Sequence, residues 1–279
     1  MRIELNGQNT HIYINQNEFN LANTLDCGQC FRWVKGEDDT YTGVVHDILI
    51  QVSQTENEII FHNTLKEDVI SIWCNYFDLD TDYKQIHQEL VFDEPIKTAI
   101  NYAGGIRILR QPSFEALCSF IISQNNNIPR IKGCIDKLCK KFGTKINDEY
   151  YSFPTPQTLS KLEKEDMQDL SLGYRDEYIL DCAKKVVDGE INLDEIAQMD
   201  IVSAREALRT IKGVGPKVAE CALLFGFYRV EAFPIDTWIK KVLQYYYKDG
   251  FPQQARPYAG IAQQYLFHYV RTCPDAPKI

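Results

Sequence analysis

The chain contains no hydrophobic run that approaches the roughly 18 residues of a membrane-spanning helix. Its first residues, Met1 to Asn6, include no basic stretch followed by an apolar one, which a signal peptide needs. Internal repeats and low-complexity tracts are also missing, and a hydrophobic fraction of 44% excludes a disordered chain. We therefore expect an intracellular protein without a membrane segment, located in the cytoplasm of a bacterium.

The sequence also lacks a cysteine framework. Its nine cysteines are odd in number and scattered, and a chain of 279 residues can bury enough core to fold without disulfides. Cys27 and Cys30 form a C-x-x-C pair, but no second pair or histidine cluster lies near enough to complete a zinc site. We expect free thiols and no metal, with a metal at this pair as the alternative.

Basic residues are too few for a protein that coats nucleic acid, since 30 Lys and Arg stand against 39 Asp and Glu, a net charge of −9. The charges are unevenly distributed. Residues 66–94 carry eight acids and two lysines, whereas residues 128–145 carry six basic residues and one acid. One face can therefore meet a polyanion while the rest stays acidic, although a solvated helix face gives the same pattern.

The first sixty residues predict a small antiparallel sheet. Five short segments there are rich in β-branched and aromatic residues and are separated by polar turns: 10–14, 30–34, 41–45, 48–52 and 59–61. From about residue 66 onward, apolar residues recur three and four positions apart, which is typical of helices. We predict an α+β fold, with an N-terminal antiparallel β-sheet domain over residues 1–95 and a mostly helical body over residues 96–279.

A helix-hairpin-helix motif is predicted at about residues 203–226. Ser203 to Glu206 fits a capping box, so we expect the first helix to begin there and to run to Ile211. Gly213-Val214-Gly215 ends it, and Pro216 stands at the first position of the second helix. The free N–H groups of that helix's first turn can bind a phosphate, although a tight corner in a helical core would look the same.

Two side chains near the hairpin suggest chemistry. Lys217 lies in the first turn of the second helix, where the helix dipole disfavours a cation, and Asp236 is the expected N-cap of the next helix. A nucleophilic lysine needs a free amine and a nearby acid that manages charge in the transition state. Lys217 and Asp236 are therefore a candidate catalytic pair, with a solvated lysine and an ordinary cap as the alternative.

The segment from Leu208 to Trp238, with its GVGPKVAEC and PID sequences, resembles the helix-hairpin-helix DNA glycosylases, and distant matches narrow the resemblance to the 8-oxoguanine DNA glycosylases. These matches are a base-contact loop at Gly28–Trp33, an asparagine-rich loop at Ser123–Arg130, a wedge at Gly173–Arg175 and a pocket-closing segment at Ala259–Phe267. They follow the family's order and span nearly the whole chain.

The resemblance implies that the protein flips 8-oxoguanine out of duplex DNA and into a pocket. Phe267 and Cys221 would sandwich the base there, and Gln263 would read its Watson–Crick edge. The backbone carbonyl of Gly28 would distinguish the lesion from guanine, because oxidation at C8 turns N7 from an acceptor into a donor.

For the opposite strand, the resemblance implies that Asn125 fills the space that the flipped nucleotide leaves, with Tyr174 wedged beside it. Arg130 and Arg175 would hold the orphaned cytosine, because an arginine fork matches its acceptor edge. The expected partner is therefore double-stranded DNA with 8-oxoguanine opposite cytosine, bound by a monomer.

The resemblance further implies that Lys217 attacks C1′, expels the base and holds the sugar as a Schiff base, after which β-elimination cuts the strand. Asp236 would stabilise the positive charge that develops on the sugar. No redox or organic cofactor is needed. Three hairpin residues would grip the backbone 3′ of the lesion, in some members through a bound cation: Gly213, Gly215 and Val218.

Two departures from the family pattern stand out. Trp238 and Val270 replace a His and an Asp that help animal members hold the phosphate of the flipped nucleotide, so that contact is left open. Only Cys273 follows Cys221, which disfavours the iron-sulfur relatives.

Two other functions are consistent with parts of the sequence. A glycosylase for another damaged base, such as an alkylated purine, would use the same motif, but Lys217 speaks against it because monofunctional enzymes manage with the acid alone. A non-catalytic DNA-binding protein would keep the hairpin as a phosphate clamp, and the catalytic and pocket residues would then be coincidences.

Overall fold

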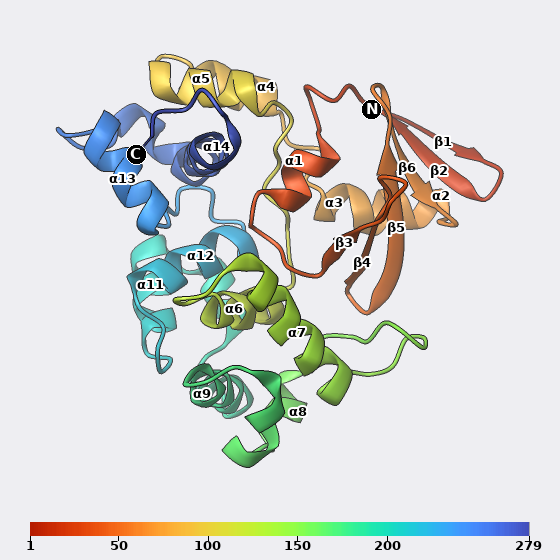
Figure 1. The fold of residues 1–279 in the computed structure, drawn as a ribbon, viewed down its shortest axis with the longest axis vertical. Coiled ribbons are helices and arrows are strands. Elements are labelled where there is room, and N and C mark those ends of the chain that lie inside the picture. The colour runs from red at the N-terminus through yellow and green to blue at the C-terminus, as the bar shows by residue number, and fades with distance from the viewer. Residues whose placement is uncertain (279) are drawn as a thin grey trace.

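The computed structural model describes residues 1–278 and shows one six-stranded antiparallel sheet beside a larger helical body (Figure 1). Ile279, the last residue of the predicted helical body, lies outside the described residues. The predicted α+β class is confirmed. The strands, in chain order, are β1 (Arg2–Asn6), β2 (Asn9–Tyr13), β3 (Trp33–Lys35), β4 (Tyr41–Val45), β5 (Ile48–Gln54) and β6 (Glu58–His62).

The sheet has the spatial order β1-β2-β6-β5-β4-β3, so that β2 pairs with β6 while the last four strands form a meander. The edge strand β1 was not predicted. It pairs with β2, with Ile3 opposite Ile12, but it has no fully buried residue and therefore carries only a weak hydrophobic pattern. The predicted strand at residues 30–34 begins only at Trp33, because residues 27–32 form the turn that follows a short helix.

That short helix, α1 (Leu21–Asp26), was also missed. Its N-cap is Asn20, whose side chain accepts a hydrogen bond from the backbone N–H of Asn23. A helix of six residues is too short to show a helical period in the sequence. It matters because it delivers Gly28 to the junction between the sheet and the helical body.

Helices occupy the chain from residue 66 onward, as predicted, and none of those described is long and apolar enough to span a membrane. They are α2 (Lys66–Asp68), the π-helical η1 (Val69–Trp73), α3 (Cys74–Tyr76), α4 (Tyr83–Leu90), α5 (Glu94–Tyr102), α6 (Ser113–Ile122), α7 (Ile128–Phe142), α8 (Pro156–Leu159), the 3₁₀ helix η2 (Lys164–Leu170), α9 (Arg175–Val187), α10 (Leu193–Gln198), α11 (Ile201–Arg209), α12 (Pro216–Gly226), α13 (Thr237–Tyr246), the 3₁₀ helix η3 (Gln253–Tyr258) and α14 (Ala259–Thr272).

Two hydrophobic cores hold these elements together. The smaller core lies under the sheet and contains Trp33, Phe61 and Trp73. The larger core fills the helical body, and it includes Leu90 of α4 and Ile96 of α5, which packs against α14. Helices on both sides of residue 95 thus share one core, while the domain boundary expected there stays a prediction.

The first helix of the hairpin begins earlier than predicted, and the capping box at Ser203 was wrong. α11 starts at Ile201, and the side chain of Asp200 accepts from the backbone N–H groups of Val202 and Ser203. The Ser203 hydroxyl donates to Asp200 instead of capping the helix. A carboxylate prevails at this position because it accepts two amide protons and its charge is stabilised by the helix dipole.

A half-buried histidine links α4 to α14. Nε2 of His87 lies 3.0 Å from the hydroxyl of Tyr265, which donates to the backbone carbonyl of Ile106. Burial, and then the positive charge of Arg107, lowers the pKa of His87 to about 4. In the unfolded chain the same group titrates near 6.5, so folding stability is lost as the pH falls from that value toward 4.

We expect His87 alone to cost about 2 to 3 kcal/mol of folding stability when the pH falls from about 7 to about 4.5. Urea unfolding of the wild type and of His87→Gln at both pH values measures this contribution. Other groups also titrate, so the informative quantity is the difference between the two proteins. Parallel pH dependences in both would show that His87 takes up its proton without a penalty.

Candidate active site

Five separate parts of the chain line one cleft of about 690 Å³. They are the turn after α1, the loop between α6 and α7, the start of α12, the start of α13 and the second half of α14. Seven residues that the sequence predicted for the site lie in this lining: Gly28, Asn125, Gly215, Lys217, Val218, Asp236 and Phe267. The fold thus brings the two candidate catalytic residues into one cavity.

Lys217 is half-buried at the second position of α12. Its Nζ lies 3.2 Å from Oγ of Ser123 and 5.3 Å from the centroid of the Phe120 ring. Within the part of the chain that the structure describes, no carboxylate forms an ion pair with this amine. A hydroxyl and an aromatic face therefore hold the amine in the cleft without the strong stabilisation of its charge that an ion pair would give.

Asp236 is the N-cap of α13, as predicted. Its Oδ1 accepts a hydrogen bond of 2.8 Å from the backbone N–H of Ile239. This bond fixes the carboxylate at the wall of the cleft. A fixed negative charge there can stabilise a positive charge that develops on a bound molecule.

Cys221 follows Lys217 by one turn of α12 and is 3% exposed. Burial raises the pKa of its thiol, and the nearby charge of Lys217 only partly opposes this. The thiol is therefore protonated at neutral pH, which makes it a packing surface and a poor nucleophile. It does not line the cleft, so its predicted contact with a base stays a prediction.

Gly28 stands at the junction of the cleft with α14. Its φ of +84° is in the left-handed region, and a Cβ atom there would lie 3.5 Å from Cε1 of Phe267 and 3.6 Å from Cδ1 of Ile128. Glycine is needed for the backbone conformation, and the phenyl ring packs directly against it. Gln29, whose role the sequence did not indicate, holds this turn: its side chain is fully buried and donates to two backbone carbonyls, those of Thr24 and Arg107.

Gln263 lies one turn before Phe267 on α14 and is 4% exposed. Its Oε1 is buried and has no hydrogen-bond partner among the described residues. A buried acceptor without a donor costs free energy, which a bound molecule that supplies an N–H group would restore. Gln263 is not among the residues that line the cleft, so its predicted contact with a base stays a prediction.

The asparagine-rich loop meets the predicted wedge, as the resemblance implied. Nδ2 of Asn125 donates to the hydroxyl of Tyr174 over 3.3 Å, and Tyr174 is 45% exposed. Asn125 itself has a φ of +46°, a left-handed conformation that asparagine tolerates better than most residues. Both side chains stand at the surface, where a duplex can reach them.

The two arginines predicted to read the opposite base differ in the free protein. Arg130 is exposed, with one weak bond of 3.4 Å from Nη2 to the carbonyl of Ser171. Arg175 is 4% exposed, and its guanidinium donates to the backbone carbonyls of Leu172, Gln124 and Asn125. Arg130 is thus free to contact DNA, whereas Arg175 holds the two loops that carry Asn125 and Tyr174.

The hairpin between α11 and α12 has the predicted form. Gly213 has a φ of +78°, and a Cβ atom there would overlap the Tyr178 ring, so only glycine fits. Around Gly215, the N-cap of α12, a Cβ atom would meet nothing within 4 Å. No side chain caps α12, so the N–H groups of its first turn are available to a phosphate.

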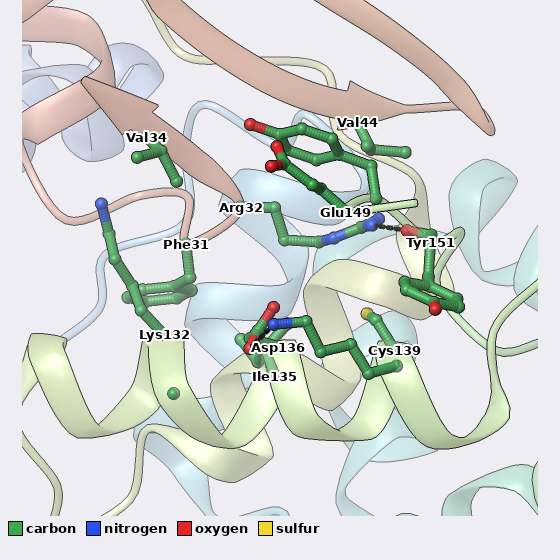
Figure 2. A pocket seen from close by; sticks show the side chains of 13 residues that line it. Phe31, Arg32, Val34, Val44, Lys132, Ile135, Asp136, Cys139, Glu149 and Tyr151 are labelled. Carbon is green, nitrogen blue, oxygen red and sulfur yellow. Dashed lines mark hydrogen bonds and ion pairs between the residues drawn. The ribbon is translucent and has the colours of Figure 1, made fainter. Parts of the chain in front are cut away.

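A second cavity of about 280 Å³ lies between α7 and the sheet, and Figure 2 shows Arg32 reaching across it toward Tyr151. Its basic side chains already have partners: Arg32 pairs with Glu115 at 3.1 Å, and Lys132 donates to the carbonyl of Trp33. Asp136 pairs with Lys140. Because the basic side chains of this cavity are already paired, and Lys217 and Asp236 both lie in the larger cleft, the larger cleft is the candidate active site.

All nine cysteines are free, and no group of three or more possible metal ligands occurs among residues 1–278. Cys27 and Cys30 are both buried, and burial raises the pKa of Cys27 to about 12. A thiol must lose its proton to bind a metal, so this environment is unfavourable for a ligand.

Comparisons with known proteins match both parts of the chain. The family model described as "8-oxoguanine DNA glycosylase, N-terminal domain" matches residues 11–117, and that of the "HhH-GPD superfamily base excision DNA repair protein" matches residues 118–254. The N-glycosylase/DNA lyase of Saccharomyces cerevisiae is 31% identical to this chain over 257 residues, which cover 82% of this chain and 68% of the yeast protein.

Two solved structures share the complete fold. That of MBOgg1 in complex with a low-affinity DNA ligand has a TM-score of 0.90 at 41% identity, covering 97% of this chain and 98% of the other. The 8-oxoguanine glycosylase/lyase of Clostridium acetobutylicum, in complex with double-stranded DNA containing cytosine opposite 8-oxoguanine, has a TM-score of 0.89 at 36% identity, with the same coverage of 97% and 98%.

Proposed function

Because this chain belongs to the 8-oxoguanine DNA glycosylase/lyase family, we propose that Lys217 is the nucleophile with which it excises 8-oxoguanine from duplex DNA. The enzyme is bifunctional: it cleaves the bond between base and sugar and then cuts the strand. One observation supports the assignment most strongly. Lys217 is a half-buried amine without an ion pair in the described chain, and it shares a cleft with the fixed carboxylate of Asp236.

The base must leave the duplex before Lys217 can reach C1′, since a stacked nucleotide cannot be attacked. We propose that the flipped base enters beside Gly28 and Phe267. The orphaned Oε1 of Gln263 would accept a hydrogen bond from the Watson–Crick edge of the base, which carries N–H donors. The Gly28 carbonyl would accept the N7 proton that 8-oxoguanine has and guanine lacks, and Cys221 would pack against the ring.

The proposed covalent step follows from these positions. The Lys217 amine bonds to C1′ as the bond from C1′ to the base breaks. The electron pair of the broken bond leaves with the base, which takes up a proton. The negative charge of Asp236 stabilises the positive charge that builds up on the sugar. The amine then loses a proton, the bond from C1′ to the ring oxygen O4′ breaks, and O4′ takes up a proton, which leaves a protonated imine, the Schiff base.

The imine makes strand cleavage possible, because it acidifies the protons on C2′. Removal of one of them breaks the C3′–O bond, and the 3′ phosphate departs as the leaving group. These steps involve no redox change of the protein and use the Lys217 amine and the Asp236 carboxylate, so we propose that the reaction needs no redox or organic cofactor. All the proposed groups come from one chain, which supports a monomer as the active form.

The hairpin would hold the DNA backbone during this reaction. Gly215 leaves open space, and the first turn of α12 at Val218 presents unpaired N–H groups to a phosphate on the 3′ side of the lesion. Gly213 would keep the turn tight enough for that approach. The exposed side chains of Asn125 and Tyr174 would fill the space that the flipped base leaves in the duplex.

Borohydride trapping tests this function directly. Borohydride reduces the imine, so the wild-type enzyme should become cross-linked to duplexes that contain 8-oxoguanine and not to undamaged or alkylated-purine duplexes. Trapping on the alkylated-purine duplex alone would favour a glycosylase for that base. Binding to every duplex without cross-linking would indicate a non-catalytic DNA-binding protein.

Cytosine is the proposed base opposite the lesion, and the two arginines should contribute to this preference differently. We expect Arg130→Ala to lose about 1 to 3 kcal/mol of preference for cytosine over adenine, because exposed Arg130 can hydrogen bond to the base. Arg175→Ala should slow excision opposite all four bases, since it releases the loops that Arg175 holds. The double variant should excise opposite cytosine and adenine at similar rates.

Single-turnover excision opposite each of the four bases, at two salt concentrations, measures both effects. If Arg130→Ala weakens all four pairs equally and reduces the salt dependence, Arg130 binds phosphate and does not read the base. If Arg175→Ala changes only the pair with cytosine, its guanidinium leaves the loop carbonyls to contact the base.

A further inference from the structure

Arg271 is a cation in the cleft that the sequence did not identify. It lies on α14, one turn after Phe267, and its Cζ stands 4.7 Å from the centroid of the Phe267 ring. Its Nη1 is 3.7 Å from the position that a Cβ atom would take on Gly28. The guanidinium is therefore fixed against the two residues that form the proposed base contact.

The charge of Arg271 is not neutralised within the protein. The side chain belongs to an exposed residue, and no carboxylate of residues 1–278 forms an ion pair with it. The neighbouring His268 is buried, and both burial and the charge of Arg271 lower the pKa of His268, so the histidine adds no positive charge at neutral pH. The charge of Asp26 opposes this lowering of the His268 pKa and is the smallest of the three causes. Asp26 forms no ion pair with Arg271 within residues 1–278.

The cleft as a whole is positive in an otherwise acidic protein. Its lining contains three cations, Lys217, Lys240 and Arg271, and a single carboxylate, Asp236, whereas the chain carries a net charge of −9. Such a local reversal of charge attracts and holds a phosphate. Of the three cations, Arg271 is the one seated beside the proposed base contact at Gly28 and Phe267.

We propose that Arg271 binds a backbone phosphate of the flipped nucleotide, from the wall of the cleft that Gly28 and Phe267 form. The inference rests on the proposed function, because a base held at Gly28 with its sugar at Lys217 leaves its flanking phosphates at the mouth of the cleft. A guanidinium can stack one face on an aromatic ring while its fork donates to two phosphate oxygens. The edge of the Arg271 guanidinium would thus donate to the phosphate, while its face stacks on the Phe267 ring.

The test compares Arg271→Met, which keeps an apolar contact with Phe267, and Arg271→Lys, which keeps the charge. Both are made in the Lys217→Gln background, so that binding to an 8-oxoguanine duplex is measured without chemistry. Each released phosphate contact changes the slope of log affinity against log salt by about 0.9. Between 50 and 200 mM salt, the Arg271→Met protein should therefore lose about three- to fourfold less affinity than its parent.

Arg271→Lys should keep the parent's slope, and Arg2→Met, which removes an arginine from β1, should also leave it unchanged. Undamaged duplex should bind to all these proteins with one common slope, because no nucleotide enters the cleft. An unchanged slope for Arg271→Met on the lesion duplex, or an equal change on undamaged duplex, overturns the proposal. Melting temperatures confirm that each variant is folded.

A chemically neutral phosphate identifies the contact. Replacing one phosphate that flanks the lesion with a methylphosphonate should abolish the difference between Arg271→Met and its parent, on one side of the lesion. If neither replacement does so, Arg271 does not bind the flipped nucleotide. Failure of the proposed function gives a different result, whatever the salt slopes are: either the wild-type enzyme forms no borohydride-trapped complex with the 8-oxoguanine duplex, or Lys217→Gln still forms one.

Discussion

Lys217→Gln should bind duplexes that contain 8-oxoguanine but neither release the base nor become cross-linked by borohydride. The amide keeps the polarity and most of the length of the lysine, whose amine lies 3.2 Å from the Ser123 hydroxyl in the native protein. It has no lone pair basic enough to attack C1′, so both steps of the reaction are lost. Single-turnover excision and trapping assays measure the effect.

Lys240→Gln is the matched control, because Lys240 is the other lysine that lines the cleft. This variant should still excise the base and form the trapped complex. A trapped complex with Lys217→Gln, together with none from Lys240→Gln, would move the nucleophile to Lys240. Trapping by both variants would place the nucleophile outside the lysines of the cleft.

Asp236→Asn should slow base release by about two to three orders of magnitude while the protein stays folded. The substitution removes the negative charge that stabilises the sugar in the transition state. It leaves an oxygen in place to accept the hydrogen bond from the Ile239 N–H, and asparagine ranks with aspartate as an N-cap. The rate under single-turnover conditions should fall much further than for Arg130→Ala.

Asp200→Asn provides the control for capping, since Asp200 is the N-cap of α11 and lies outside the cleft. The free energy of unfolding of both variants should lie within about 1 kcal/mol of the wild-type value, and only Asp236→Asn should lose activity. If the two variants lose equal stability and Asp236→Asn excises 8-oxoguanine at the wild-type rate, Asp236 acts only as a cap.

Much of the fold could be predicted because its signals are local. The meander of β4, β5 and β6 alternates and is rich in β-branched residues, and the turn before Pro216 is marked by two glycines. The α1 helix and the β1 strand were missed because one is too short and the other too exposed to show a period. The helix start at Asp200 was missed because Asp200 and Ser203, three residues apart, are both suitable N-cap residues, and the sequence does not show which of them begins the helix.

Site residues could be predicted where their chemistry is specific to the residue type. They could not be predicted where only their place in the folded protein gives them a role. Lys217 and Asp236 are recognisable near a hairpin, and the cleft holds both. Arg271 has no motif around it, and only the packing of α14 against Gly28 places it in the cleft. Arg175 fits a base-reading pattern, but its bonds to loop carbonyls depend on tertiary contacts that no spacing reveals.

Burial protects the thiols of this enzyme from the oxidants that create its substrate. Eight of the nine cysteines are buried, and burial is the main cause that raises the pKa of six of them: Cys27, Cys30, Cys74, Cys118, Cys139 and Cys221. Peroxide reacts with thiolates and hardly at all with protonated thiols, so few reactive sulfurs are present at neutral pH. We therefore expect the buried thiols of the repair protein to stay reduced under the conditions in which guanine is being oxidised.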